Sequence, residues 1–259
     1  MKLTEPLPSL SDVARLLLAI GCQFMESGES ARLINDQLST VAKELGCDSA
    51  EIYCQHAAII VTLRRGNELC VQMGKVGEHG VNLRRSEATR DIVDRIASRE
   101  LSCAAAQSEL DGLGRTIVSY QIWLVCIATG IACSAFGRLL GADWPSFLPI
   151  MIATAAGQYI RHSLMVRHHN VFIVNGIVSF VSALIAGEGA RLLGSSKLDI
   201  ATVSAVLLLV PGIAVVNIQK DAIEGKPNLA AARALRVLYL LLFMTIGLLA
   251  AQRLVFSSV

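Results

Sequence analysis

The stretch Ser204–Asp221, SAVLLLVPGIAVVNIQKD, decides how the rest of the chain is organised. Residues 200–219 carry no charged side chain, and at ~1.5 Å per residue a helix of that length crosses a hydrocarbon layer of ~30 Å. The stretch therefore predicts a membrane-spanning helix. Pro211 cannot donate a hydrogen bond to the carbonyl of Leu207, and its ring clashes there. We expect the helix to bend or open at Pro211 and Gly212.

A break inside a membrane helix is informative about function. Lipid cannot satisfy the freed backbone groups, so breaks are tolerated where protein or a watery cavity does so. The break therefore indicates a substrate path. Ala214, Asn217 and Asp221 follow it on one helical stripe, and a carboxylate at a membrane edge is a candidate functional site. The alternative is that Pro211 kinks the helix for packing alone and Asp221 only caps the helix end.

Composition divides the chain into two unlike parts. Hydrophobic residues make up 53% of it, charged residues 17%, and its mean hydropathy is +0.55. Residues 1–116 hold 13 Lys and Arg against 16 Asp and Glu, whereas residues 117–259 hold 10 against 5. We expect a cytoplasmic α+β domain over 1–116 and an all-α membrane domain over 117–259. The first part has no basic patch suited to nucleic acid.

The period of the apolar residues changes along the first part. Spacings of three and four predict a helix over Val13–Phe24, preceded by Ser11, and a second over Ala31–Leu45, stopped by Gly46. Alternation then predicts strands over residues 50–55, 59–63 and 69–73, with a hairpin turn at Arg65-Gly66-Asn67, and helical spacing returns over residues 84–101 and 104–113.

Five transmembrane helices are predicted in the second part, at about 117–140, 144–163, 170–187, 199–218 and 234–253. We find no signal peptide, so we place the N-terminal domain in the cytoplasm. The loops then carry six basic residues inside against two outside, in agreement with the positive-inside rule. Five spans then put the C-terminus on the outer side of the membrane, so this predicts a multi-pass membrane protein.

Two polar stripes in this part are expected to face protein rather than lipid. One consists of Thr154, Gln158 and Arg161, and the other of Asn175, Ser179 and Ser182. The second stripe is typical of helix packing. Arg161 offers a planar fork that matches a carboxylate. It is a candidate for substrate binding, and lipid phosphate or Asp221 are its alternative partners.

Signals for enzyme chemistry are weak. Cys54 and His56 point to one side of a strand, but no third group orients them, so we predict that the chain is not an enzyme. The seven cysteines show no C-x-x-C spacing and are interpreted as core residues of a reducing compartment. We expect no metal and no cofactor. Residues Gly28-Glu29-Ser30-Ala31 fit either ordinary helix capping or an anion held by amides at a helix start.

Several of these residues resemble the threonine/serine exporter family over almost the whole chain. They are Ser204–Gly212 with Asn217 and Asp221, Tyr159-Ile160-Arg161 with Leu164 and Arg167-His168, Gly28–Ala31, and Asp48–Glu51. The chain is most similar to the N-terminal subunit of the two-component branch. The resemblance implies a soluble domain plus about five spans, paired with a separate small membrane subunit. It further implies succinate export for the enteric pair, and threonine and serine export for the single-chain members.

These observations predict an exporter subunit for small carboxylates, foremost a dicarboxylate such as succinate, that works as an oligomer with a small integral membrane subunit. Its proposed substrate-binding residues are Gln158, Arg161, Pro211, Gly212, Asn217 and Asp221. One alternative is a proton-coupled threonine/serine exporter. Another is a membrane-anchored metabolite sensor or scaffold, which would not need a helix break flanked by polar stripes.

Overall fold

The structure, a computed structural model, describes residues 7–77, 80–116 and 120–257. The chain forms two compact units. The first unit comprises Met1–Val118 and Gly212–Ala234, and the second comprises Ser119–Pro211 and Leu235–Val259. The segment Gly212–Ala234 is called the arm below. It belongs to the first unit although it follows most of the second in sequence. The predicted boundary between a cytoplasmic domain (1–116) and a membrane domain (117–259) stays a prediction, because the structure contains no membrane.

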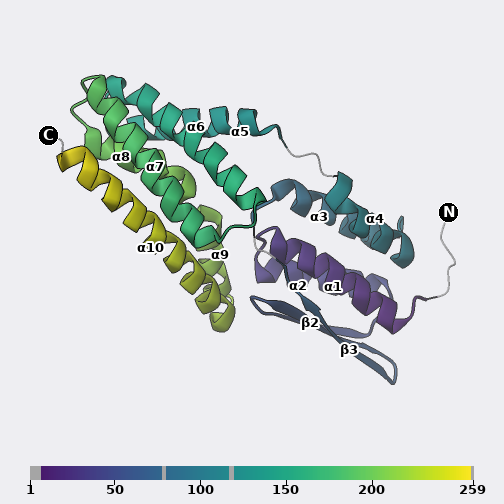
Figure 1. Cartoon of the computed structure of the whole chain (residues 1–259). Coiled ribbons are helices and arrows are strands. Elements are labelled where there is room, and N and C mark those ends of the chain that lie inside the picture. The colour runs from purple at the N-terminus through teal and green to yellow at the C-terminus, as the bar shows by residue number, and fades with distance from the viewer. Residues whose placement is uncertain (1–6, 78–79, 117–119, 258–259) are drawn as a thin grey trace. The chain divides into compact units, whose positions relative to one another are not determined.

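Two helices cover one face of a sheet in the first unit (Figure 1). They are α1 (Leu10–Glu26) and α2 (Ala31–Glu44). Both predicted helices are confirmed, but the cap of α1 is Ser9, two residues before the predicted Ser11. The Ser9 hydroxyl accepts a hydrogen bond from the amide of Asp12 at 3.1 Å, which satisfies an otherwise free amide of the first turn.

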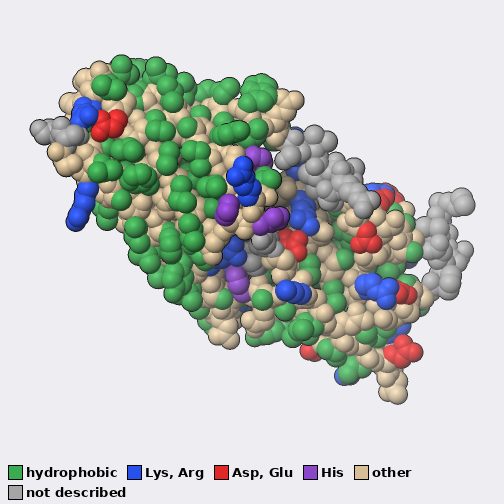
Figure 2. All heavy atoms as spheres, viewed as in Figure 1, with side chains coloured by type: hydrophobic (Ala, Val, Ile, Leu, Met, Phe, Trp, Pro, Cys, Tyr) green, Lys and Arg blue, Asp and Glu red, His purple; other side chains and the backbone are tan. Residues whose placement is uncertain are grey.

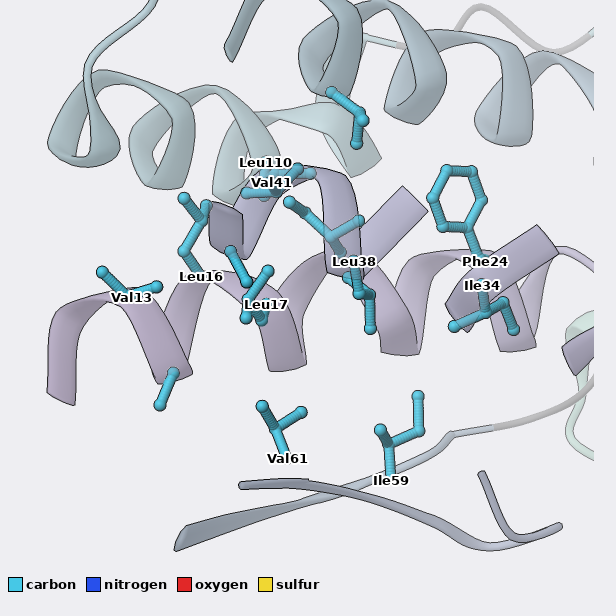
Figure 3. Close-up of a cluster of buried hydrophobic side chains, with 14 of the residues drawn as sticks. Val13, Leu16, Leu17, Phe24, Ile34, Leu38, Val41, Ile59, Val61 and Leu110 are labelled. Atoms are coloured by element: carbon cyan, nitrogen blue, oxygen red, sulfur yellow. The ribbon is translucent and has the colours of Figure 1, made fainter. Parts of the chain in front are cut away.

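The sheet has three antiparallel strands in the order β1-β2-β3, and the predicted hairpin is confirmed. The strands are β1 (Ser49–Cys54), β2 (Ala58–Arg65) and β3 (Glu68–Lys75). Strand β2 is central, and its residues Ile59, Val61 and Leu63 are fully buried beneath the helices. Figure 3 shows Ile59 and Val61 pointing toward helical side chains that include Leu17 and Ile34. This core is what stabilises the first unit.

The remaining predicted helices of this unit are also present, as α3 (Leu83–Ala97) and α4 (Cys103–Thr116). Ile92 and Ile96 of α3 and Leu110 of α4 join the same core. The unit therefore has a single α+β core, to which Leu229 of the arm also contributes.

The second unit is built from helices α5 (Ile122–Leu139), α6 (Trp144–Val166), α7 (Val171–Leu192), α8 (Leu198–Val206) and most of α10 (Pro227–Ser257). Hydrophobic side chains cover much of its surface on the face shown in Figure 2. Among the exposed ones are Trp123, Ile127, Ile152, Ile173, Leu238, Leu242 and Ile246. An apolar exterior of this kind suits a lipid environment.

Three of the described helices, α5, α7 and α10, are long and apolar enough to cross a membrane. A fourth span results if α8 and the helix after it are counted as one broken span. Helix α6 has 23 residues, but it carries Gln158 and Arg161 and is not among these spans. Five spans are therefore not confirmed. Residues 117–119 of the first predicted span lie outside the described residues.

The serine stripe of α7 faces protein, as predicted. Asn175, Ser179 and Ser182 are at most 2% exposed, and the Ser179 hydroxyl donates to the Met244 carbonyl of α10 at 2.7 Å. Helices α7 and α10 approach closely because both have a glycine at the crossing. A Cβ added to Gly247 would lie 2.2 Å from the Gly176 carbonyl oxygen. Small residues that allow such backbone approach are characteristic of membrane helix packing.

Candidate functional site

The predicted break in the central helix is present. Helix α8 ends at Val206, a 3-10 turn covers Leu207–Leu209, and α9 (Gly212–Ile223) begins directly after Pro211. Val210 has an extended backbone, with φ −67° and ψ 119°. Because Pro211 has no amide hydrogen and the first residues of any helix lack intrahelical acceptors, the break leaves free amides at the start of α9. No backbone acceptor among the described residues binds the amides of residues 212–214.

Asp221 lies on the arm, two turns into α9, and is completely buried. Its Oδ2 accepts a hydrogen bond from Nη1 of Arg233, on α10, at 2.6 Å. Arg233 also donates to the Glu29 carbonyl at 3.1 Å and contacts the Met25 sulfur at 3.5 Å. The sequence alone did not identify Arg233 as the partner of Asp221. The two residues are separated by a turn, and no helical spacing rule joins them.

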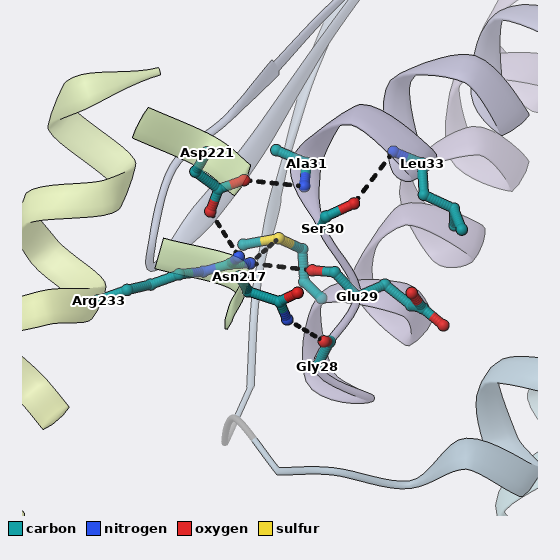
Figure 4. Close-up of polar contacts among 9 residues, drawn as sticks. Gly28, Glu29, Ser30, Ala31, Leu33, Asn217, Asp221 and Arg233 are labelled. Carbon is teal, nitrogen blue, oxygen red and sulfur yellow. Dashed lines mark hydrogen bonds and ion pairs between the residues drawn. The ribbon is translucent and has the colours of Figure 1, made fainter. Parts of the chain in front are cut away.

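The second oxygen of Asp221 binds the start of α2. Its Oδ1 accepts from the Ala31 amide at 3.2 Å, while Ser30 caps the same helix by accepting from the Leu33 amide (Figure 4). Residues 28–31 thus show both predicted features, a capped helix start and an anion bound at its amides. Ser30 provides the ordinary cap, and the anion at the amides is the carboxylate of Asp221. A negative charge is stabilised at this end of a helix.

Asn217 fixes the same turn from one helical turn earlier on α9. Its side-chain amide donates to the Gly28 carbonyl at 2.5 Å, and the residue is 7% exposed. Gly28 has φ +87°, and a Cβ there would lie 2.8 Å from the Gly80 carbonyl oxygen. Only glycine fits that backbone without strain. The arm is therefore anchored to the turn Gly28–Ala31 by Asn217, Asp221 and Arg233 together.

A hollow of ≈490 Å³ lies beside this anchor within the first unit. Gly212, Asn217 and Lys220 form part of its α9 wall, and the turn Ser27–Glu29 faces them. We call it the α9 hollow. It contains two of the predicted substrate-binding residues, Gly212 and Asn217.

The other predicted residues lie in the second unit. Gln158 and Arg161 lie on α6 in the polar stripe, and both are half-buried. Pro211 is the last residue of the second unit before the arm. The buried Nε of Arg161 has no hydrogen-bond partner among the described residues. The guanidinium therefore keeps donor capacity for a carboxylate or phosphate group.

The thiol of Cys54, the candidate nucleophile considered from the sequence, is not activated. Burial raises the pKa of Cys54, and this outweighs the lowering effect of Lys226 and Arg233. A raised pKa keeps the thiol protonated and a poor nucleophile. Within residues 7–77, 80–116 and 120–257, no cluster of three or more His, Cys, Asp or Glu side chains is placed to hold a metal ion.

The profile of the family described as "Putative threonine/serine exporter" (ThrE) matches residues 15–255. The chain is 26% identical over 222 residues to the "Probable succinate transporter subunit YjjP" of Escherichia coli K12, covering 85% of this chain and 86% of that protein. It is 26% identical over 241 residues to the protein of the same name from Klebsiella aerogenes, covering 93% of each. An uncharacterized protein of Haemophilus influenzae is 24% identical over 132 residues, 51% of this chain and 44% of that protein.

No solved structure matches the chain significantly. The family profile nevertheless covers both units, the arm and the helix break. The chain therefore belongs to the threonine/serine exporter family and is a membrane transport protein.

Proposed function

We propose that this chain is the exporter subunit for small carboxylates, foremost a dicarboxylate such as succinate, in the bacterial inner membrane. The observation that carries the proposal is the helix break at Val210–Pro211 in a chain of this family. Free amides at the start of α9 give a positive end that attracts anions. The names of the relatives from E. coli and K. aerogenes support succinate as the cargo. The word "subunit" in those names supports a partner, which we propose is a second, small integral membrane protein.

In this proposal Arg161 and Gln158 bind the carboxylate from α6, and Pro211 and Gly212 open the helix beside the path. Asn217 and Asp221 follow on α9, where both bind the turn Gly28–Ala31 within the first unit. The membrane potential helps to choose the cargo. Moving one charge through ~100 mV is worth about 2.3 kcal/mol, so a dianion leaving an inside-negative cell gains roughly 4.6 kcal/mol without a coupling ion.

Proton-coupled export of threonine or serine is the second candidate, and the family description favours it. A zwitterion gains nothing from the potential, so it needs a proton carrier. Both oxygens of Asp221 already accept hydrogen bonds, from Ala31 and Arg233. Asp221 could carry a proton only if the proton replaced Arg233 as its partner. Asp221→Asn therefore separates the candidates. Proton-coupled transport stops, whereas uniport of a dianion persists in variants that stay folded.

The test in cells is succinate export by a strain that expresses this chain with its candidate small subunit. Arg161→Ala and Asn217→Ala are each expected to lower export without lowering the amount of protein in the membrane. Full export by both variants would show that neither Arg161 nor Asn217 takes part in transport. A reporter fused after Val259 tests the proposed topology, in which the first unit is cytoplasmic and α6 completes five spans. Reporter activity confined to the cytoplasm would contradict it.

A further inference from the structure

The α9 hollow combines an uncompensated positive charge with an apolar wall. Lys220 is exposed, lines the hollow and forms no ion pair with any described residue. Glu29 also lines it, but its carboxylate already binds the Ser86 hydroxyl and pairs with Arg90 at 3.3 Å. The acidic charge in the wall is therefore neutralised within the protein, and the charge of Lys220 is left to attract an anion.

Two further sets of donors line the same hollow. The amides at the start of α9 are free, and Gly212 and Ile213 form part of the wall. Ser27 is 3% exposed, and its buried hydroxyl has no hydrogen-bond partner among the residues described. A buried hydroxyl without a partner is costly, so its presence beside a hollow points to a ligand that accepts its hydrogen bond.

The spacing of the donors fits a short ligand that is charged at both ends. Gly212 and Lys220 are eight residues apart, about 12 Å along α9 at ~1.5 Å per residue. Helical side chains lean toward the helix start, so the long side chain of Lys220 can extend over Val216 toward Gly212. Val216, Ile213 and Leu83 give the hollow an apolar stretch that suits a short hydrocarbon chain.

We propose that the α9 hollow binds the carboxylate substrate before it reaches the helix break. Lys220 pairs with one carboxylate, and the free amides of α9 and the Ser27 hydroxyl hydrogen-bond the other. This inference rests on the proposed function. It adds Lys220 and Ser27 to the site, and it gives the first unit a direct part in choosing dicarboxylates over monocarboxylates.

The test is succinate binding to the purified full-length chain, measured by calorimetry, with butyrate and inorganic phosphate as comparison ligands. Lys220→Gln is expected to weaken succinate binding about tenfold or more, as for the loss of a charge-assisted hydrogen bond. Ser27→Ala is expected to weaken it severalfold. The matched control is Lys226→Gln, a lysine on the same arm outside this hollow, which is expected to leave affinity unchanged.

The outcomes separate the inference from the function on which it rests. Unchanged succinate affinity and export in Lys220→Gln would overturn the inference and leave carboxylate export standing. Equal losses in Lys220→Gln and Lys226→Gln, or phosphate bound as tightly as succinate, would also overturn it, because both indicate a general attraction of anions. A wild-type chain that neither binds nor exports any carboxylate with its partner present would overturn the proposed function itself.

Discussion

Asp221 and Arg233 are twelve residues apart in sequence and form a buried ion pair of 2.6 Å that connects α9 to α10. The side chains are 0% and 9% exposed, respectively. Each also bonds the turn between α1 and α2, through the Ala31 amide and the Glu29 carbonyl. The pair thus connects the two helices of the arm and attaches the arm to the first unit.

Arg233→Met is expected to release the arm. Removing one partner of a buried pair leaves an uncompensated charge and typically costs about 3–5 kcal/mol. Hydrogen exchange of the Ala31 amide measures the effect, because that amide donates to Asp221. We expect its exchange to accelerate strongly. The control is Arg236→Met, one turn further along α10, where the arginine forms no ion pair with a described residue. Unchanged exchange in Arg233→Met would show that the pair does not hold the arm.

Reversing the pair distinguishes a simple bridge from an anchor on α2. In the double variant Asp221→Arg with Arg233→Asp the charges could still attract each other. The Ala31 amide would nevertheless lose its acceptor, and a cation would face the positive start of α2. We therefore expect no recovery of Ala31 protection. Full recovery would mean that the charge attraction alone matters.

Gly212→Ala tests whether the glycine at the start of α9 serves the fold or the path. An added Cβ at Gly212 meets no atom within 4 Å, and alanine favours a helix by about 1 kcal/mol over glycine. We expect the variant to fold with equal or slightly higher thermal stability and to export succinate severalfold more slowly, because the methyl group shields the free amides. Wild-type export would show that substrate does not approach this backbone.

Gly247→Ala is expected to disrupt the packing of α7 against α10. The new Cβ would lie 2.2 Å from the Gly176 carbonyl and 3.0 Å from the Phe180 amide, and neither backbone atom can move away without shifting a helix. Overpacking of this kind costs about 1–3 kcal/mol or more. Thermal unfolding in detergent should show a lowered Tm. The matched control is Gly112→Ala in α4, where an added Cβ meets nothing within 4 Å. Equal Tm values for the two variants would contradict this packing.

Asp143 gives the second unit a pH dependence. Burial raises its pKa, but hydrogen bonds from the Ser195 hydroxyl and from the amides of Ser146 and Ser196 outweigh this and hold the pKa below its ordinary value of 3.8. A depressed pKa means that Asp143 stabilises the fold fully above pH 3.8 and loses this contribution as the pH falls through its lower folded value.

The measurement is the difference in Tm between wild type and Asp143→Ala across pH 3 to 7. We expect a near-constant difference from pH 5 to 7, corresponding to about 1 kcal/mol for a lost helix cap, and a smaller difference toward pH 3. A difference that grows on acidification would contradict the direction of the shift.

The local periods of the sequence predicted much of the first unit. Alternation at residues 50–55 and 59–63 and the turn at Gly66 predicted the hairpin sheet, because a period of two places one face on a core. Helical spacing predicted α2 to within a residue. The choice of Ser9 over Ser11 as the cap of α1 depends on where the chain enters the helix, which the apolar period does not specify.

The site was only partly predictable, for a physical reason. The break at Pro211 follows from covalent geometry and is readable from the sequence. The partners of Asp221 and Asn217 are 190 and 189 residues away, and no local rule connects residues so distant. The assignment of the arm to the first unit likewise depends on tertiary contacts, whereas the uncharged run up to Gln219 predicted only a span that bends at Pro211.

Carboxylate export through this chain is tested most directly by reconstitution. The chain and its small membrane partner are placed in liposomes loaded with labelled succinate, and efflux is followed with and without an imposed inside-negative potential of about 100 mV. The account predicts efflux that requires the chain, accelerates with the potential and is reduced in Arg161→Ala. Succinate retained under both conditions, with threonine or serine released in exchange for protons from liposomes loaded with these amino acids instead, would contradict it.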